Sequence, residues 1–218
     1  MTDALETLRP AVFIVNSDEA ARAWIQATVN SAGFEARSFN SAAEFLSSFK
    51  PGAASCVILD VVLSDASGFE LQQNISRAGA SIVFMTREHC FTSCVKAVKA
   101  GAANFLTLPC EGIQLIRALR DALREAMSAW SERLQIGELH ARYDLLTSRE
   151  RQVFALVSAG LSNKLVARQL GISEITVQIH RGRVTRKMSA RSIASLVRMF
   201  DALERSPPLA GAELLMSA

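Results

Sequence analysis

Polar side chains stand directly after three short apolar runs in the first hundred residues. They are Asn16-Ser17-Asp18 after residues 12–15, Asp60 after residues 57–59 and Thr86 after residues 81–85. In an open parallel sheet, chemistry gathers at the carboxyl ends of the strands. The spacing therefore predicts one site where a carboxylate, an amide and hydroxyl groups lie close together.

These positions depend on alternating strands and helices. Apolar runs predict strands at residues 12–15, 34–39, 57–59, 81–85 and 104–106. Amphipathic stretches predict helices at residues 19–32, 41–49, 69–77 and 90–100, and from Gly112 onward. Alternation with short connections predicts an α/β domain of the flavodoxin-like, doubly wound kind, with a five-stranded parallel sheet between helices.

Length and composition exclude several classes of protein. The chain has 218 residues, of which 50% are hydrophobic and 21% charged, which suits two ordinary domains and not a disordered or collagen-like chain. No uncharged apolar run is long enough to span a membrane, and the first residues are acidic where a secretory signal is basic. Four cysteines without CxxC spacing fit a reducing compartment. We expect a cytoplasmic protein with no membrane partner.

The net charge of +3 is divided unevenly along the chain. Residues 141–205 hold twelve Lys and Arg against five Asp and Glu, a net charge of +7. The remainder holds twelve against sixteen, a net charge of −4. A basic C-terminal part favours a nucleic-acid partner, although an ordinary basic surface explains the charge equally well without a supporting motif.

The C-terminal part carries helical patterns and no strand pattern. Thr147, Ser162, Ser173 and Ser192 are typical helix caps, and the tight turn at residues 170–172 is typical of a helix-turn-helix. We expect an all-α domain of four helices. The predicted organisation is an α/β domain at 10–127, a helical linker at 128–141, the helical domain at 142–206 and a loose tail at 207–218.

One long helix is expected to join the two domains. Its apolar stripe repeats every three or four residues, at Ile113, Ile116, Leu119, Leu123, Ala126, Trp130 and Leu134. The first half would cover the sheet and the second half would reach the next domain. A dimerising coiled coil is the alternative, with about three heptads available.

The C-terminal motif resembles a known DNA-binding family. Residues 146–188 read LTSRERQVFALVSAGLSNKLVARQLGISEITVQIHRGRVTRKM, which resembles the LuxR-type helix-turn-helix. The N-terminal part resembles the receiver domain of two-component response regulators. Together they are similar to the NarL/FixJ class, and to its FixJ-like members in particular. The resemblance implies a transcription regulator in phosphorelay signal transduction.

Residues 174–188 form the helix that would read double-stranded DNA. Its N-terminal half can enter the major groove, where glutamine suits adenine and an apolar side chain contacts a thymine methyl. By resemblance, the base-reading positions are Gln178, Ile179 and Gly182. Basic side chains and two hydroxyls would contact phosphates; they are Lys164, Arg181, Arg183, Arg186, Lys187 and Arg191, with Ser173 and Thr176. Glycine inside a helix costs about 1 kcal/mol, so Gly182 either admits close approach of DNA or is incidental.

Receiver chemistry, as the resemblance implies it, transfers a phosphoryl group to an aspartate beside Mg²⁺. Asp60 matches the phosphoacceptor, and Val62 matches the residue whose carbonyl binds the metal. Thr86 matches the switch hydroxyl and Phe105 the switch aromatic side chain. Pro109 matches a proline whose preceding bond is usually cis.

Three positions depart from that pattern. Asn16 and Ser17 replace the acidic pair that holds Mg²⁺, and Leu108 replaces the lysine that pairs with the phosphoryl group. Mg²⁺ prefers carboxylates, and Asp18 would substitute only in part. We predict an atypical receiver that works without phosphorylation of Asp60 and without a cofactor. The alternatives are conventional phosphorylation by a sensor histidine kinase, with Mg²⁺, and a receiver switched by a redox change, a ligand or a protein partner.

The resemblance also implies partners. The last helix carries an apolar stripe, Ile193, Leu196, Val197 and Phe200, which in the family pairs with a second copy, although core packing explains most of these residues. We expect a homodimer on DNA, and the sequence leaves open whether RNA polymerase and a sensor kinase are partners. With no nucleophile–base pair and no metal cluster in the sequence, we expect no enzymatic activity.

The cysteines suggest one further hypothesis. Cys90 and Cys94 are four residues apart on a predicted helix, with His89 beside them, and Cys110 follows Pro109. A redox or metal switch at this surface is possible chemistry, but packing of each thiol as a small apolar group is the favoured interpretation.

Overall fold

The computed structural model describes residues 10–50, 54–76, 79–87 and 91–206. The chain divides into two compact units, Met1–Ser131 and Glu132–Ala218. The division falls inside the stretch 128–141, for which the sequence predicts a linker. Helix α6 (Gly112–Asp144) begins in the first unit and ends in the second.

The first unit is built on a parallel sheet with the strand order β2-β1-β3-β4-β5. The strands are β1 (Ala11–Val15), β2 (Ala36–Phe39), β3 (Ser55–Leu59), β4 (Ser81–Thr86) and β5 (Asn104–Thr107). This order confirms the predicted doubly wound fold. The ends of β1 and β4 flank the end of β3, so the polar residues after these three strands share one edge of the sheet.

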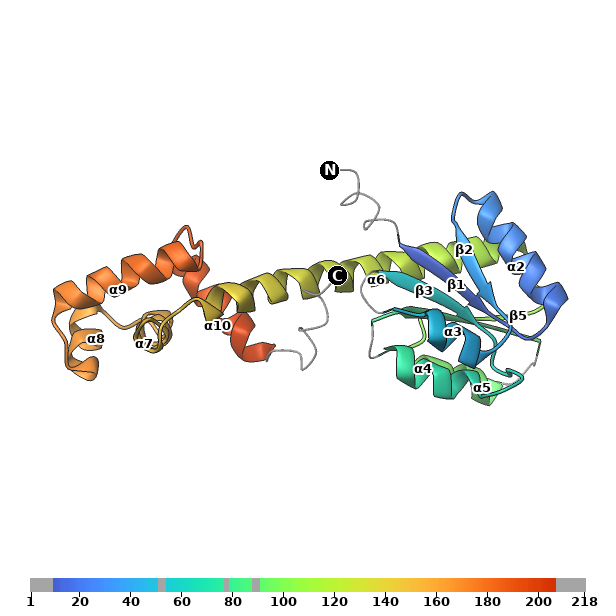
Figure 1. The fold of residues 1–218 in the computed structure, drawn as a ribbon, viewed down its shortest axis with the longest axis horizontal. Helices are drawn as coiled ribbons and strands as arrows, with labels where there is room; N and C mark the ends of the chain where they lie inside the picture. The colour runs from blue at the N-terminus through green and yellow to red at the C-terminus, as the bar shows by residue number, and fades with distance from the viewer. Residues whose placement is uncertain (1–9, 51–53, 77–78, 88–90, 207–218) are drawn as a thin grey trace. The chain divides into compact units, whose positions relative to one another are not determined.

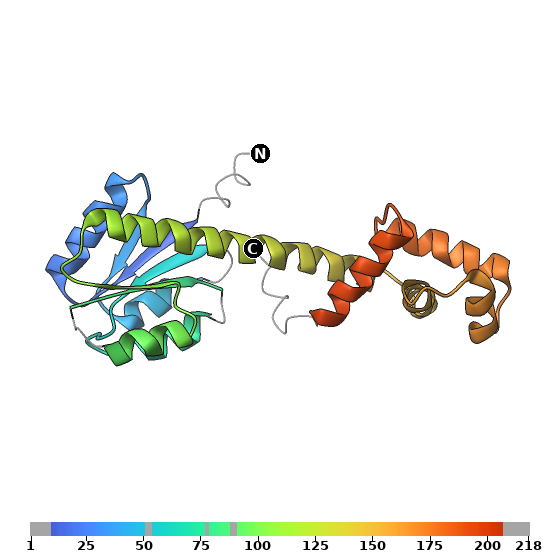
Figure 2. The ribbon, with the colours of Figure 1, turned by 180° about the vertical axis from the view of Figure 1, so that it is seen from behind.

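Helices cover both faces of this sheet (Figures 1 and 2). They are α2 (Glu19–Ser31), α3 (Ala42–Ser48), α4 (Gly68–Ser76), α5 (Phe91–Lys99) and α6. Along β3, Val57 and Leu59 share one core cluster with side chains of α3, α4 and α5. Cys56 and Ile58 share the other cluster with side chains of α2 and α6. The continuous apolar strands predicted this burial on both sides.

Gly68 allows α4 to start beside the end of β3. A Cβ at this position would lie 2.1 Å from the carbonyl oxygen of Asp60, which is far inside van der Waals contact. The Gly68 N–H also donates to the Val61 carbonyl at 2.9 Å. Glycine is therefore required where the backbone after Asp60 meets the first turn of α4.

The element boundaries differ slightly from prediction. β2 begins at Ala36 and not at Phe34, because the Phe34 N–H donates to the Val29 carbonyl at the end of α2 while its ring packs on the core. The predicted last residue of the third helix, Arg77, and first residue of the fourth, Cys90, lie outside the described residues.

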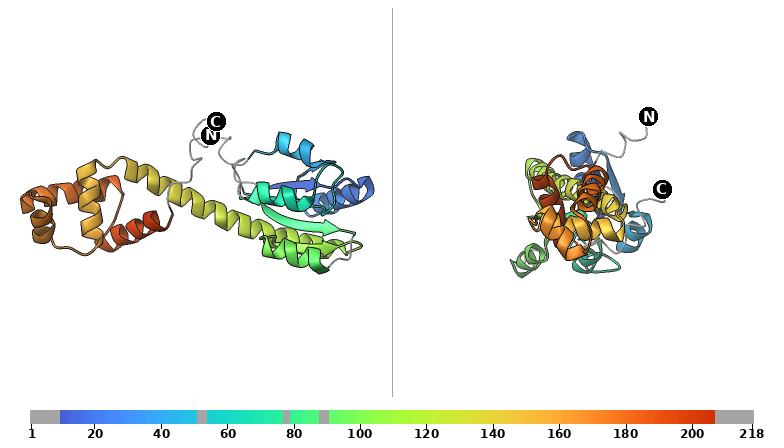
Figure 3. Two further views of the ribbon diagram at one scale, coloured as in Figure 1. Left: turned by 90° about the horizontal axis from the view of Figure 1, so that it is seen from below. Right: turned by 90° about the vertical axis from the view of Figure 1, so that its left-hand side faces the viewer.

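The second unit is a bundle of helices that begins with the last turns of α6. The other helices are α7 (Ser148–Ser158), α8 (Asn163–Leu170), α9 (Glu174–Lys187) and α10 (Ile193–Arg205). All four predicted caps accept a hydrogen bond from the first turn of their helix. Gly171 ends α8 in the left-handed region, at φ 66°, which makes the tight turn into α9. Helices α8 and α9 lie side by side (Figure 3).

Helix α7 supplies the core of this unit on two sides. Phe154 packs with Leu139 of α6, with Leu196 and against the Phe200 ring, whose centre is 5.3 Å away. Val153 packs in a second cluster with side chains of α8 and α9. Leu196 and Phe200 therefore belong to the core, whereas Ile193 of the same stripe is 54% exposed.

A buried ion pair joins α7 to the end of α9. Glu150 is 2% exposed, and its Oε2 accepts hydrogen bonds from Lys187 Nζ at 2.7 Å and from the Thr147 N–H at 2.9 Å. Lys187 Nζ also donates to the Leu145 carbonyl at 2.9 Å. Burial opposes ionisation of Glu150, but the hydrogen bonds outweigh it and hold its pKa below the ordinary value.

Removing Lys187 should leave the Glu150 carboxylate buried without its counter-charge. Because the Lys187 side chain is 29% exposed, we expect Lys187→Met to lower the free energy of unfolding by about 2 kcal/mol near neutral pH, less than for a fully buried pair. The exposed neighbour provides the control: Arg186→Met should change it by less than about 0.5 kcal/mol. Denaturant unfolding followed by circular dichroism measures both variants.

The Glu150–Lys187 pair also predicts how the stability difference between wild type and Lys187→Met depends on pH. A carboxylate with a depressed folded pKa stabilises the protein above its unfolded pKa and loses that contribution as the pH falls through the folded pKa. In Lys187→Met, the unpaired carboxyl takes up a proton more readily. The difference in stability between the two proteins should therefore shrink between about pH 7 and about pH 3, and a constant difference would contradict this account.

Candidate functional site

Asp60 follows β3, and its surroundings come from the neighbouring strands. The Asp60 N–H continues the ladder by donating to the Val15 carbonyl at 3.0 Å. The Val62 N–H lies 3.4 Å from Asp60 Oδ1, so the side chain caps its own loop. Thr86, the last residue of the neighbouring strand β4, is 1% exposed. The predicted acceptor and switch hydroxyl thus stand on adjacent strands.

Asn16 forms hydrogen bonds within the turn between β1 and α2 and with the first turns of α2. It is 1% exposed, and its side-chain oxygen accepts the Asp18 N–H at 2.8 Å. Its carbonyl accepts Arg22 Nη1 at 2.6 Å. The amide therefore holds the start of α2 in place, with its oxygen turned to the protein's own backbone.

Ser17 joins three loops at this edge of the sheet. Its hydroxyl donates to the Asn40 carbonyl after β2 at 3.1 Å and accepts the Ser64 N–H after β3 at 2.8 Å. Asp65 adds a second tie between two of these loops, because its two carboxylate oxygens accept the N–H groups of Ala42 and Ala43 at 3.0 and 2.9 Å. Those two bonds hold the pKa of Asp65 below its ordinary value.

Asp18 has a structural role that the sequence indicates only in part. It caps α2 by accepting the Ala21 N–H at 3.0 Å, and its other oxygen pairs with Arg87 Nη2 at 3.0 Å. The hydrogen bond from Ala21 is the main cause that lowers its pKa, and Arg87 adds to it. Sequence reasoning missed Arg87, although a cation directly after the Thr86 position was a visible signal.

Strand β5 and the segment after it contain the remaining receiver positions. Phe105 is half-buried, with its ring centre 6.1 Å from that of Phe84. The Leu108 side chain packs on the core cluster beneath α2 and α6, and its N–H donates to the Thr86 carbonyl at 2.8 Å. The Leu108–Pro109 bond is cis. The lysine position is thus filled by an apolar side chain that the core holds.

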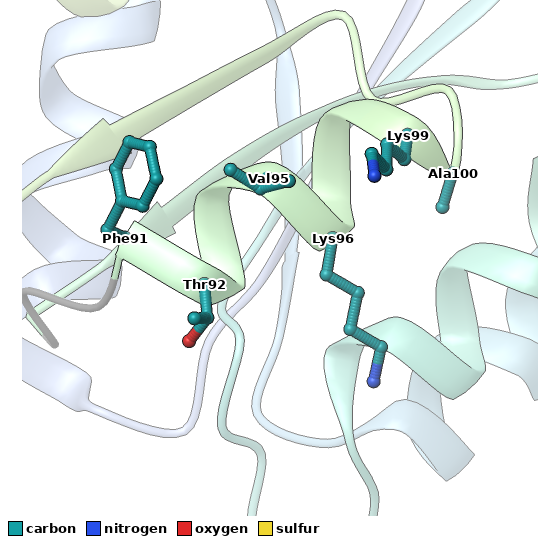
Figure 4. Close-up of a pocket in the computed structure, with 6 residues that line it drawn as sticks. All are labelled: Phe91, Thr92, Val95, Lys96, Lys99 and Ala100. Carbon is teal, nitrogen blue, oxygen red and sulfur yellow. The ribbon is translucent and has the colours of Figure 1, made fainter.

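Helix α5 presents an exposed apolar surface (Figure 4). Phe91 is 83% exposed and Val98 is 55% exposed. A shallow hollow of about 550 Å³ lies along the helix, lined by Phe91, Thr92, Val95, Lys96, Lys99 and Ala100. The Lys96 ammonium stands 4.3 Å from the centre of the Phe69 ring. The apolar side chains that line the hollow are those of Phe91, Val95 and Ala100.

One face of α9 carries the predicted base-reading residues. Gln178, Ile179 and Gly182 are exposed, Ile179 by 51%, and a Cβ at Gly182 would meet nothing within 4 Å. Val177 and Val184 are buried on the opposite face. The helix therefore separates a packed side from a side that is open to a ligand.

The predicted phosphate-contacting residues fall into two groups. Those with exposed side chains are Lys164, Ser173, Arg183, Arg186 and Arg191. The others are engaged within the unit. Arg181 donates to the Asn163 side chain, Lys187 holds Glu150, and Thr176 shares a hydrogen bond of 2.8 Å with Ser173. Arg181 and Lys187, which the sequence predicts as phosphate contacts, thus also make contacts within the unit.

The cysteines do not form a recognisable cluster within the described residues. Cys56 is buried, which raises its pKa to about 12, and burial also raises the pKa of Cys110. Cys90 and His89, from the predicted switch surface, lie outside the described residues. In the described part of the chain, no three His, Cys, Asp or Glu side chains are grouped as a metal site would require.

Among the described helices, none is long and apolar enough to cross a membrane.

Comparisons with known proteins agree with both units. Residues 12–120 match the family described as "Response regulator receiver domain", and residues 144–200 match "Bacterial regulatory proteins, luxR family". The response regulator protein TmoT of Ectopseudomonas mendocina is 36% identical over 197 residues, covering 89% of this chain and 90% of its own. The transcriptional regulatory protein FixJ of Bradyrhizobium diazoefficiens is 33% identical over 195 residues, covering 88% and 95%.

A solved structure of a response regulator is similar to this chain over both units. The response regulator StyR is 36% identical, with a TM-score of 0.80, over 88% of this chain and 98% of that one. The predicted resemblance is confirmed on both units. The chain belongs to the NarL/FixJ class of response regulators, transcription regulators that join a receiver domain to a LuxR-type DNA-binding domain.

Proposed function

We propose that this response regulator controls transcription through a receiver that does not depend on phosphorylation of Asp60. The observation that carries the proposal is the hydroxyl of Ser17, which ties three loops together at the position of a family metal ligand. These hydrogen bonds engage the Ser17 hydroxyl within the protein, at a position where the family's chemistry needs a carboxylate to hold Mg²⁺.

The side chains at this edge are a poor fit for Mg²⁺. The ion prefers several oxygen ligands, carboxylates among them, in near-octahedral geometry. Here Asn16 turns its oxygen to a backbone N–H, Ser17 is engaged on both sides, and Asp18 is held by a helix cap and by Arg87. Of the two carboxylates in the predicted pocket, Asp18 and Asp60, the first is thus already taken up by a helix cap and an ion pair. We therefore propose no metal cofactor.

DNA recognition is proposed to rest on the exposed face of α9. Gln178 and Ile179 would meet base edges in the major groove, and Arg183 and Arg186 would neutralise phosphates. Ser173, as the N-cap, places the first turn of this helix. Lys187 and Arg181 are proposed to act mainly by holding α9 against α7 and α8.

Family membership also supports a proposal for the oligomeric state, cellular location and partners of this protein. We propose a homodimer on DNA, supported by exposed Ile193 on α10 and exposed Phe91 on α5. Action in the cytoplasm, contact with RNA polymerase and the lack of a catalytic activity of its own are part of this proposal. A sensor kinase is required only if the alternative, phosphorylation of Asp60 with Mg²⁺, holds.

Treatment with acetyl phosphate and Mg²⁺ tests the receiver proposal. We expect no phosphorylated form above the level of the Asp60→Asn variant, by mass spectrometry of the intact protein, and an unchanged DNA footprint. The physical reason is the shortage of negative ligands for the metal. Stoichiometric phosphorylation that disappears in Asp60→Asn would overturn the proposal.

Salt dependence tests the DNA-binding face. With a duplex selected from a random-sequence pool, Arg186→Ala should weaken binding and reduce the slope of log affinity against log salt by about 1. Arg205→Ala, an exposed arginine at the end of α10, is the matched control and should leave the slope unchanged. Equal slopes for wild type and Arg186→Ala would remove this residue from the phosphate contacts.

A substitution at Gly182 tests the stability of α9 and its recognition of DNA independently. Because a Cβ there meets nothing within 4 Å, Gly182→Ala should raise the free energy of unfolding by about 1 kcal/mol through helix propensity. If the DNA backbone approaches this position, the same variant should bind the selected duplex more weakly. Raised stability with unchanged affinity, measured by denaturant unfolding and fluorescence anisotropy, would show that the glycine is incidental to recognition.

A further inference from the structure

A hollow lies beside the receiver edge, between α2 and the segments that follow β4 and β5. Its volume is about 480 Å³, within the range of about 300–1,000 Å³ that small-molecule sites occupy. The described residues that line it are Ala20, Ala21, Trp24, Arg87, Leu108, Pro109 and Cys110. We refer to it as the Arg87 hollow.

The chemistry of the Arg87 hollow combines an apolar floor with one cation. Leu108, which stands where the family has a lysine, makes the floor apolar together with Pro109. The Trp24 side chain adds an aromatic wall that is 37% exposed. Arg87 is the one charged side chain among its described lining residues. Pockets that bind small organic molecules have this composition, in which a few polar groups orient an apolar body.

The cation is held loosely enough to change partners. Arg87 and Asp18 form an ion pair between side chains that are 64% and 37% exposed, and exposed pairs contribute little stability. The pair uses Nη2 of a guanidinium that carries five N–H donors in a planar fork. A carboxylate on a ligand can therefore bind the fork in bidentate geometry, either beside Asp18 or in its place.

The position of this ion pair gives binding a consequence for the receiver. Asp18 follows β1 and Arg87 follows β4, and β3 lies between those two strands. The pair therefore spans the carboxyl end of β3, where Asp60 stands. A ligand that draws Arg87 from Asp18 breaks the ion pair that links the residues following β1 and β4, while the Ala21 N–H still donates to Asp18 Oδ1.

We propose that the Arg87 hollow binds a small organic carboxylate, with its apolar body against Trp24 and Leu108 and its carboxylate on Arg87. An apolar floor solvates an inorganic phosphate poorly, and the Asp18 carboxylate, which pairs with Arg87, repels a dianion more strongly than a monoanion. A singly charged group on an apolar body is the chemistry that fits. The site does not depend on whether Asp60 is phosphorylated, so it stands or fails separately from the proposed function.

Calorimetric titration of the full chain with 2-naphthoate tests the site. We expect wild type to bind 2-naphthoate saturably. The uncharged analogue 2-naphthamide should bind wild type at least about tenfold more weakly, a difference of about 1.4 kcal/mol in binding free energy. The Arg87→Gln variant should bind 2-naphthoate more weakly than wild type by at least the same factor. Arg117→Gln, an exposed arginine on α6 outside the hollow, is the matched control and should bind like wild type. Thermal unfolding of each variant confirms that it is folded.

Alkylation of the thiols locates the ligand. Cys110 lines the hollow, whereas Cys94 on α5 has similar partial exposure and does not line it. Saturating 2-naphthoate should slow the reaction of Cys110 with iodoacetamide, measured by peptide mass spectrometry, and leave the rate at Cys94 unchanged. If wild type does not bind 2-naphthoate, if the amide binds equally well, or if Cys110 is not protected, the proposal is overturned.

Discussion

The hydroxyl of Ser17 is the interaction on which the receiver edge depends. By donating to Asn40 and accepting from Ser64, it holds the loops after β1, β2 and β3 in one arrangement. Asp65 strengthens that arrangement by capping α3 from the loop after β3. At this edge Asn16 and Ser17 supply neutral side chains in place of a carboxylate pair, and Asp18 is held by the Ala21 N–H and by Arg87. The geometry of a receiver is thus retained while the charge that its usual chemistry needs is reduced.

The second unit uses charge in a different way, because its basic residues are not interchangeable. Lys187 is bonded to a buried carboxylate and to a carbonyl, and Arg181 to a side chain of α8, so both hold α9 in position. Arg183 and Arg186 on the same helix are exposed. A net charge of +7 over residues 141–205 therefore includes charges that stabilise the domain and charges that can attract DNA.

Local patterns in the sequence predicted most of the fold. Apolar runs located the strands, most clearly β1, β3 and β4, which are buried almost throughout, and Ser or Thr before an amphipathic run located the caps of α7 to α10. The departures at Asn16, Ser17 and Leu108 were also visible as residue types. The partners of long side chains were not, because Arg87 meets Asp18 across 69 positions of the chain and Lys187 meets Glu150 across 37. Pattern and spacing carry no information on such contacts until the topology is known.

Calorimetric titration of Mg²⁺ into the full chain tests the central claim most directly. If the loops at the edge of the sheet are held by hydrogen bonds of Asn16 and Ser17 and by the Asp18–Arg87 pair, titration should give no saturable heat beyond that of the Asp60→Asn variant. Saturable Mg²⁺ binding that is lost in Asp60→Asn would contradict the account, because it would show that a cation still organises this site.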